Sequence, residues 1–178
     1  CEEQSWMTVE ADMNRQHFEF EKSIRLNVTN ETLDAHRVLV KWAVRKTDAT
    51  ILREEEQWLE VPALSAVWMD KVELPQIDCF NEYVSYEAWE NDQIISQGTV
   101  IFSYPKYFHY LNPGLAVRVD GDEIVVKAEA YAKSVEIWNE NDDLILEDNY
   151  FDMNAGEHRV KILDGKPDGL TVRSVYDI

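Results

Sequence analysis

Residues 36–46 read "HRVLVKWAVRK", and their pattern indicates the fold class. Val38, Val40, Trp42 and Val44 occupy every second position. They alternate with Leu39, Lys41, Ala43 and Arg45. A period of two is typical of a β-strand with one face on a core. The segments "EIVVKAEAYA" (123–132) and "EHRVKIL" (157–163) repeat the pattern. The sequence therefore predicts an all-β protein.

Turn signals separate these runs at short intervals, for example at Asp120-Gly121 and at Asn154-Ala155-Gly156. Strands about 8–12 residues apart are typical of antiparallel, immunoglobulin-like β-sandwiches. The segment 103–114 contains two prolines, which would interrupt a central strand. We therefore predict two sandwiches in tandem, residues 1–104 and 105–178.

Two expectations concern less regular features of the sequence. The segment "ATILREEEQWLE" (49–60) comes nearest to a helical pattern, but its neighbours favour a strand that runs into an acidic loop. Four tryptophans lie within strand patterns, where large aromatic side chains usually form the core of a sandwich. These are Trp42, Trp68, Trp89 and Trp138.

The formal net charge of −18 arises from 35 acidic residues against 17 Lys and Arg, spread over both predicted domains. Nucleic acids and anionic membranes require clustered Lys and Arg, so both are excluded as partners, whereas neutral sugars are compatible. Cys1 and Cys79 supply neither a disulfide framework nor CxxC-type zinc ligands. Two free thiols fit a reducing compartment, and we expect a cytoplasmic or periplasmic protein whose targeting signal lies outside this sequence.

The C-terminal half contains a motif, "DNYFD", formed by Asp148, Asn149, Tyr150, Phe151 and Asp152, which an Ala155-Gly156-Glu157 turn follows. With the closing Val172-Arg173-Ser174-Val175-Tyr176, this half resembles the last immunoglobulin-like domain of family 2 glycoside hydrolases of the β-mannosidase type. The segments "LEVPALSAVWMDKVEL" (59–74) and "SYPKYFHYLNP" (103–113) resemble parts of the sandwich that precedes it. The resemblance covers nearly the whole chain.

The resemblance implies a retaining, exo-acting hydrolase that releases terminal β-linked mannose. Its two catalytic glutamates would belong to a (β/α)8 barrel of the same polypeptide. A barrel needs about 250 residues of alternating strand and helix, and no such alternation is present here. The chain is therefore expected to be the non-catalytic C-terminal part of such an enzyme, with the barrel as its partner.

The sequence favours a structural role for most of its candidate site residues. Asp148 and Asp152 resemble a glycosidase carboxyl pair, but two sandwiches offer no obvious sugar cleft, and no catalytic residue is expected. The acidic loops 139–148 and 164–168 lack the spacing of an EF-hand, so neither a metal nor a cofactor is expected. Gly156 is expected to adopt a positive φ.

The aromatic cluster beside the prolines has two interpretations. The side chains either bind mannose-containing oligosaccharides or pack between the domains, and packing is the favoured role. The cluster comprises Tyr104, Tyr107, Phe108 and Tyr110. Two rival functions stay open for the whole chain, an independent carbohydrate-binding module and a structural tandem of a surface protein.

Overall fold

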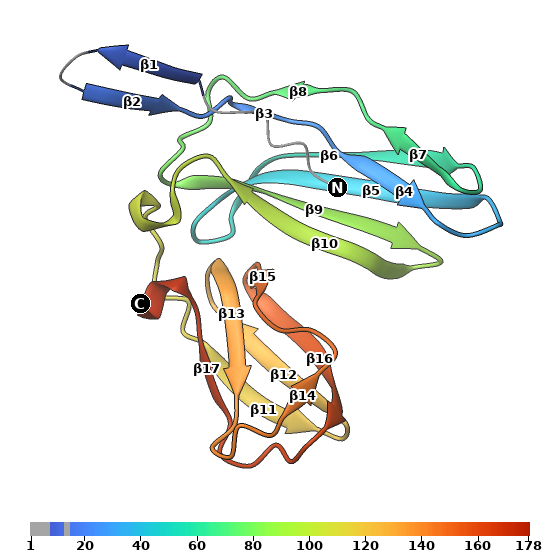
Figure 1. The fold of residues 1–178 in the computed structure, drawn as a ribbon, viewed down its shortest axis with the longest axis vertical. Helices are drawn as coiled ribbons and strands as arrows, with labels where there is room; N and C mark the ends of the chain where they lie inside the picture. Colours follow the sequence, from blue (N-terminus) through green and yellow to red (C-terminus); the bar gives the residue numbers. More distant parts are fainter. Residues whose placement is uncertain (1–7, 13–14) are drawn as a thin grey trace.

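The computed structural model describes residues 8–12 and 15–178 and confirms the all-β, two-sandwich prediction. Figure 1 shows an upper lobe built by the first half of the chain and a lower lobe built by the second. A hairpin of β1 (Thr8–Asp12) and β2 (Arg15–Glu19) precedes the upper lobe. Among the described residues, no helix is long and apolar enough to cross a membrane.

The upper lobe is a sandwich whose larger sheet has the strand order β10-β9-β5-β6, with all pairs antiparallel. The pairs β3-β8 and β4-β7 form the opposite layer. The strands are β3 (Ser23–Ile24), β4 (Asn27–Asn30), β5 (His36–Lys46), β6 (Ile51–Val61), β7 (Ser65–Trp68), β8 (Val72–Glu73), β9 (Glu82–Glu90) and β10 (Gln93–Ile101).

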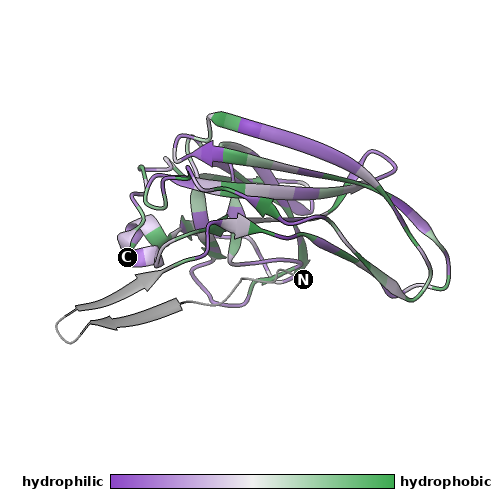
Figure 2. Cartoon of the chain, turned by 90° about the horizontal axis from the view of Figure 1, so that it is seen from above, coloured by the Kyte–Doolittle hydropathy of each residue, from purple (hydrophilic) through white to green (hydrophobic). Residues whose placement is uncertain are grey.

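The predicted alternation in β5 is confirmed by burial. Val38, Val40, Trp42 and Val44 are buried in the core of the upper lobe, between its two layers. Most residues of β6 are exposed, and Figure 2 shows hydrophilic stretches along the long strands of this sheet. One face of the sheet therefore packs in the core, and the other lies on the outside of the sandwich.

The prediction that the strand in 49–60 runs into an acidic loop is wrong, because β6 continues through Glu54, Glu55 and Glu56 to Val61. These glutamates pair in register with Ala43, Trp42 and Lys41 of β5. The strand lies at the edge of the sheet, where its side chains are exposed and charge costs little. Charged residues on an edge strand also oppose pairing with a second sheet.

The prediction that Trp68 belongs to the core is also wrong, since 39% of its surface is exposed. It lies on β7 with the Arg25 guanidinium 4.9 Å from its ring centroid. Trp42 is buried as predicted, whereas Trp89 and Trp138 are half-buried, and each of the three has a cationic side chain over its ring. Alternation alone does not tell how deeply a strand tryptophan is buried.

The lower lobe consists of two facing sheets with the orders β11-β12-β16-β14 and β15-β13-β17. The connection contains a short 3-10 helix, η1 (Pro105–Tyr107), and a second one, η2 (Val175–Asp177), follows the last strand. The strands are β11 (Ala116–Asp120), β12 (Glu123–Ala128), β13 (Ala132–Trp138), β14 (Ile145–Leu146), β15 (Phe151–Met153), β16 (Gly156–Asp164) and β17 (Thr171–Arg173). Ile124, Val126, Val135 and Val160 lie at the centre of its core.

Candidate functional site

The two lobes meet through a buried cluster of aromatic rings. Tyr83 of β9 and Tyr131, which precedes β13, are both almost fully buried and stack with their centroids 3.9 Å apart. Phe108 from the connection meets Tyr131 edge-on at 6.1 Å. The Tyr131 amide also donates a hydrogen bond to the Thr47 carbonyl of the upper lobe. The junction is therefore a small core of its own, shared by both domains.

The structure divides the predicted aromatic cluster between two places. Phe108 is buried in the junction, and Tyr110 packs beside it, 6.2 Å from Tyr131. Burial raises the pKa of Tyr110. Tyr104 and Tyr107 meet edge to face outside the junction, with ring centroids 6.3 Å apart, and Tyr107 is 54% exposed with Lys106 over its ring. Tyr107 is thus the exposed member of the cluster, whereas Tyr104 is half-buried and also packs against Phe20.

The DNYFD motif begins with Asp148 and Asn149, whose side chains form hydrogen bonds with backbone groups. Asn149 lies beside β13, where its side-chain amide donates to the Ile137 carbonyl and its oxygen accepts from the Ile137 amide. One side chain thus replaces a strand partner where the ladder between β13 and β15 has ended. Asp148 is exposed and accepts a hydrogen bond from the Asn149 amide, which caps the same turn.

The two aromatic residues of the motif point in opposite directions. Phe151 is 9% exposed and packs into the core of the lower lobe, against the His158 ring at 4.1 Å. Tyr150 is 62% exposed and has a φ of 65°, a conformation that is uncommon outside glycine. Its hydroxyl donates to Glu136, which lowers the pKa of that carboxyl.

Asp152 ends the motif and connects the two lobes. One carboxylate oxygen accepts from the Ser134 amide at 2.8 Å, at the bulge of β13, and the other forms an ion pair with Lys133 at 2.8 Å. The second oxygen also accepts from the Thr99 hydroxyl of the upper lobe, which lies 2.6 Å from the Tyr131 hydroxyl. One carboxylate therefore fixes the β13 bulge and joins it to β10.

The hairpin after Asp152 adds two further contacts across the junction. Asn154 accepts a hydrogen bond from the Tyr83 hydroxyl at 2.7 Å, and His158 lies 3.1 Å from the Gln97 amide. Burial lowers the pKa of His158. Gly156 has a φ of 134°, so the predicted positive φ is confirmed. No sequence signal identified Tyr83, Thr99 or Tyr131 beforehand, because each contact joins distant segments.

The acids of the described residues are not arranged as a glycosidase pair. A retaining enzyme needs one carboxyl kept neutral by a raised pKa beside one that is ionised. Every carboxyl pKa in the described part that departs clearly from its ordinary value is instead lowered by hydrogen bonds, and none is raised. The lowered groups are Glu21, Asp48, Asp78, Asp120 and Glu136.

The acidic loops 139–148 and 164–168 lie side by side, held by Asn139. Its amide donates to Asp143 at 2.5 Å and to the Lys166 carbonyl at 2.9 Å, so both oxygen-rich loops are tied by protein hydrogen bonds. Gly165 approaches the Asp143 carbonyl so closely that an added Cβ would lie 2.3 Å from it. Across the described residues, no group of three or more His, Cys, Asp or Glu side chains is placed to hold a metal ion.

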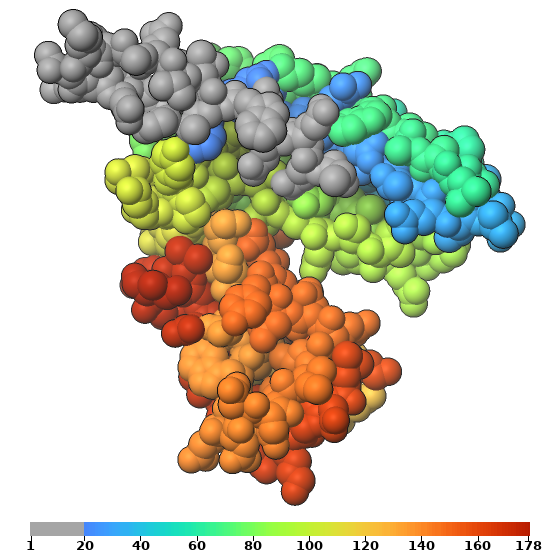
Figure 3. Space-filling model, viewed as in Figure 1, coloured from blue at the N-terminus to red at the C-terminus, as the bar shows by residue number. Residues whose placement is uncertain are grey.

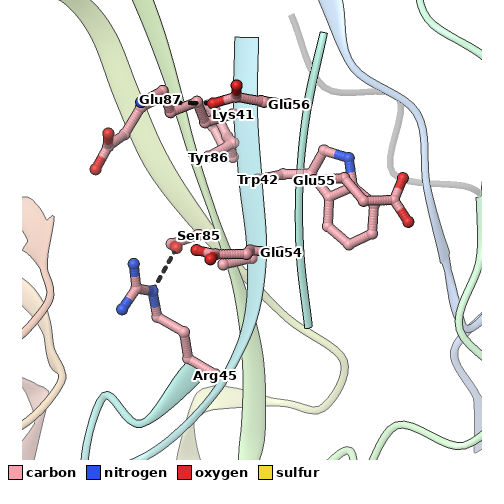
Figure 4. A pocket seen from close by; sticks show the side chains of 10 residues that line it. Lys41, Trp42, Arg45, Glu54, Glu55, Glu56, Ser85, Tyr86 and Glu87 are labelled. Atoms are coloured by element: carbon pink, nitrogen blue, oxygen red, sulfur yellow. Dashed lines mark hydrogen bonds and ion pairs between the residues drawn. The ribbon is translucent and has the colours of Figure 1, made fainter. Parts of the chain in front are cut away.

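A hollow of about 410 Å³ lies on the larger sheet of the upper lobe. Figure 4 shows Trp42 and Glu55 on one side of this sheet and Arg45 and Glu87 on the other. Arg45 donates to the Ser85 hydroxyl at 2.8 Å. A second hollow, of about 290 Å³, shares Arg45 and Glu87 and continues to the 152–158 hairpin of the lower lobe. Figure 3 shows a notch between the two lobes, beside the region where they are in contact.

Comparison with known proteins gives a family for each lobe. Residues 22–107 match the family described as "Mannosidase Ig/CBM-like domain", and residues 110–178 match a mannosidase family described as "Ig-fold domain". No curated protein matches the sequence.

Two solved structures share the fold. The β-D-mannosidase from Dictyoglomus thermophilum is 16% identical with a TM-score of 0.67, over 95% of this chain and 21% of that one. The exo-chitosanase from Amycolatopsis orientalis is 10% identical with a TM-score of 0.64, over 95% of this chain and 25% of that one. The chain thus spans a quarter or less of the length of either protein.

Proposed function

Residues 22–107 of the chain belong to the Mannosidase Ig/CBM-like domain family, and residues 110–178 belong to the mannosidase Ig-fold domain family. We propose the following function on this basis. The chain is the non-catalytic C-terminal part of a retaining, exo-acting β-mannosidase-like glycoside hydrolase. The two domains pack against a catalytic (β/α)8 barrel of the same polypeptide and stabilise it. We place their boundary between residues 104 and 105, directly before η1.

The observation that carries this proposal is the junction. Two domains of mannosidase families are held in a fixed arrangement by the buried stack of Tyr83 on Tyr131 and by the bonds of Asp152. Two domains in a rigid arrangement can stabilise a third domain, such as the proposed barrel, because a flexible linker would not transmit stability between domains. Among the described residues no carboxyl has a resolved rise in pKa, which agrees with chemistry located in another domain.

The matched structures also support the proposal. Both structures, a β-mannosidase and an exo-chitosanase, are longer chains in which a segment with this fold makes up a quarter or less of the length.

The positions of Phe108 and Tyr110 agree with a structural role for the connection. Both rings pack between the domains, which favours packing over sugar binding for that part of the predicted cluster.

The coding sequence upstream of Cys1 tests the proposal. We expect about 250 residues of alternating strands and helices, with a glutamate at the end of each of two strands. Further sandwiches or a membrane anchor in that place would instead support a structural tandem of a surface protein and contradict the proposal.

A further inference from the structure

The face of the larger upper sheet that points away from the core carries a row of apolar side chains, of which Trp58 and Ile94 are exposed and Leu39 and Trp89 are half-buried. Val38 and Val40 point into the core, so Leu39 between them points outward. Leu39 pairs directly with Trp58 of β6 on one side and with Trp89 of β9 on the other. Trp89 in turn pairs with Ile94 of β10. Directly paired residues share a face, so these four side chains cross the sheet as one row.

The two indoles of this row are held in defined orientations. The Arg37 guanidinium lies 4.4 Å from the centroid of Trp58, and the Lys41 ammonium lies 5.3 Å from that of Trp89. The Trp89 ring also donates to Glu87 at 2.8 Å. Rings fixed in this way lose little side-chain entropy when they bind a ligand. Trp58 nevertheless keeps 53% of its surface exposed.

The next residues along the strands are polar and border the hollow of Figure 4. Lys41 pairs in register with Glu56 and with Glu87, and Glu54 pairs with Ala43. Ala43 is small and buried, so the sheet is indented between longer charged side chains. An apolar row thus stands directly beside a hollow of about 410 Å³ whose walls accept and donate hydrogen bonds.

This combination fits a sugar chain better than a protein surface. The carbon-bound hydrogens of a pyranose form an apolar face that packs on an indole, and its hydroxyls donate to carboxylates. A protein that covered the same face would bury Glu54, Glu56 and Glu87 without water, and charged groups are depleted at the centre of interfaces for this reason. An anionic ligand would be repelled by the same three carboxylates.

The spacing of the indoles indicates an extended ligand. Trp58 and Trp89 are separated by one strand, which places their backbones about 9.5 Å apart. A ring can therefore stack at each end of a two-sugar unit of an extended, β-linked chain. We propose that this face, with Trp58 and Trp89 as stacking groups and Lys41, Glu54 and Glu56 as hydrogen-bonding groups, binds a neutral β-linked oligosaccharide. This binding is independent of the proposed support of a barrel.

Titration of the 178-residue chain with β-1,4-linked mannohexaose and cellohexaose, followed by calorimetry and tryptophan fluorescence, tests the proposal. We expect binding of at least one of these sugars, and an affinity about tenfold lower in Trp58→Ala and in Trp89→Ala. The matched control is Trp68→Ala, since Trp68 is also a strand tryptophan beneath an arginine but lies on the opposite layer. We expect it to bind as the parent does.

Three results would overturn the proposal. These are the absence of heat and of fluorescence change with both sugars at millimolar concentration, unchanged affinity in Trp58→Ala, and an equal loss in Trp68→Ala. The urea midpoint of each variant shows whether it is folded, and Trp58→Phe, which keeps a ring at an exposed position, should retain most of the affinity.

Discussion

The ring of Tyr83 in the upper sandwich lies nearly parallel to the ring of Tyr131 in the lower one, with centroids 3.9 Å apart and an interplanar angle of 16°. Burial raises the pKa of both phenols, so both stay neutral over the physiological range. Each hydroxyl also bonds across the junction, Tyr83 to Asn154 and Tyr131 to Thr99. The pair therefore makes the stability of one domain depend on the other.

Replacing Tyr131 by alanine should remove this dependence. The change deletes a buried ring and its hydrogen bond, and we expect a loss of about 3–5 kcal/mol in the free energy of unfolding. In urea, the single transition expected for the parent should separate into two, because the domains then unfold independently. Tyr131→Phe keeps the ring and should cost only about 1 kcal/mol. Equal effects of the two changes would contradict a role for ring packing.

Asp152 and Asp148 offer a matched pair of carboxylates. In Asp152→Ala the Lys133 ammonium and the Ser134 amide lose a partner at a site that is only 14% exposed, so we expect a loss of about 2 kcal/mol. Asp148→Ala changes an exposed cap and should cost less than about 0.5 kcal/mol. Urea unfolding of both variants measures the difference. Equal losses would show that Asp152 does not connect the lobes as described.

His158 should make the junction sensitive to pH. Burial lowers its folded-state pKa below 6.5, while Asp148 acts in the opposite direction. At pH values between the folded-state and the unfolded-state pKa of His158, the unfolded chain binds more protons than the folded chain. The free energy of unfolding therefore rises with pH in this range. The contribution of neutral His158 is complete above pH 6.5 and is lost as pH falls through the folded-state pKa.

A comparison of urea midpoints at about pH 7.5 and about pH 5 measures this contribution. The parent should lose stability between these values, and His158→Gln, which keeps a polar group beside Gln97, should lose less. Carboxyls with lowered pKa values titrate below this window and leave it undisturbed. A parent and a variant with the same pH dependence would exclude His158 as the titrating group.

The chain by itself should not hydrolyse a chromogenic β-mannoside. The described acids include no carboxyl with a resolved rise in pKa, and Asp148 and Asp152 are both engaged by hydrogen bonds of the fold. A spectrophotometric assay at high protein concentration checks this. Turnover above background that disappears in Asp148→Asn or Asp152→Asn would place chemistry in this chain and contradict its accessory role.

The sequence was sufficient for features that depend on neighbours along the chain. The period of two in residues 36–46 predicted a strand with one buried face, and the glycine at 156 predicted a positive φ in the hairpin. Both are local properties, set by the pleat of a strand and by the absence of a Cβ. The resemblance of the DNYFD motif to a family then pointed to a mannosidase-type domain.

Features that depend on distant contacts were not predictable in this way. Glu54–Glu56 resembled a loop because three adjacent acids are unusual in a strand, and only their position at the sheet edge explains them. The outward-facing Trp58 has the same sequence context as a core tryptophan. Thr99, in the upper lobe, becomes a partner of Asp152 through the relative placement of two domains, which no periodicity encodes.

If these domains support a catalytic barrel of the same polypeptide, the melting temperature of that barrel depends on them. The longer polypeptide is compared with a version that lacks residues 1–178 and with one that carries Tyr131→Ala. We predict a melting temperature of the catalytic part at least about 4 °C lower in the truncated form, with an intermediate value for Tyr131→Ala. Equal melting temperatures for all three would contradict the claim.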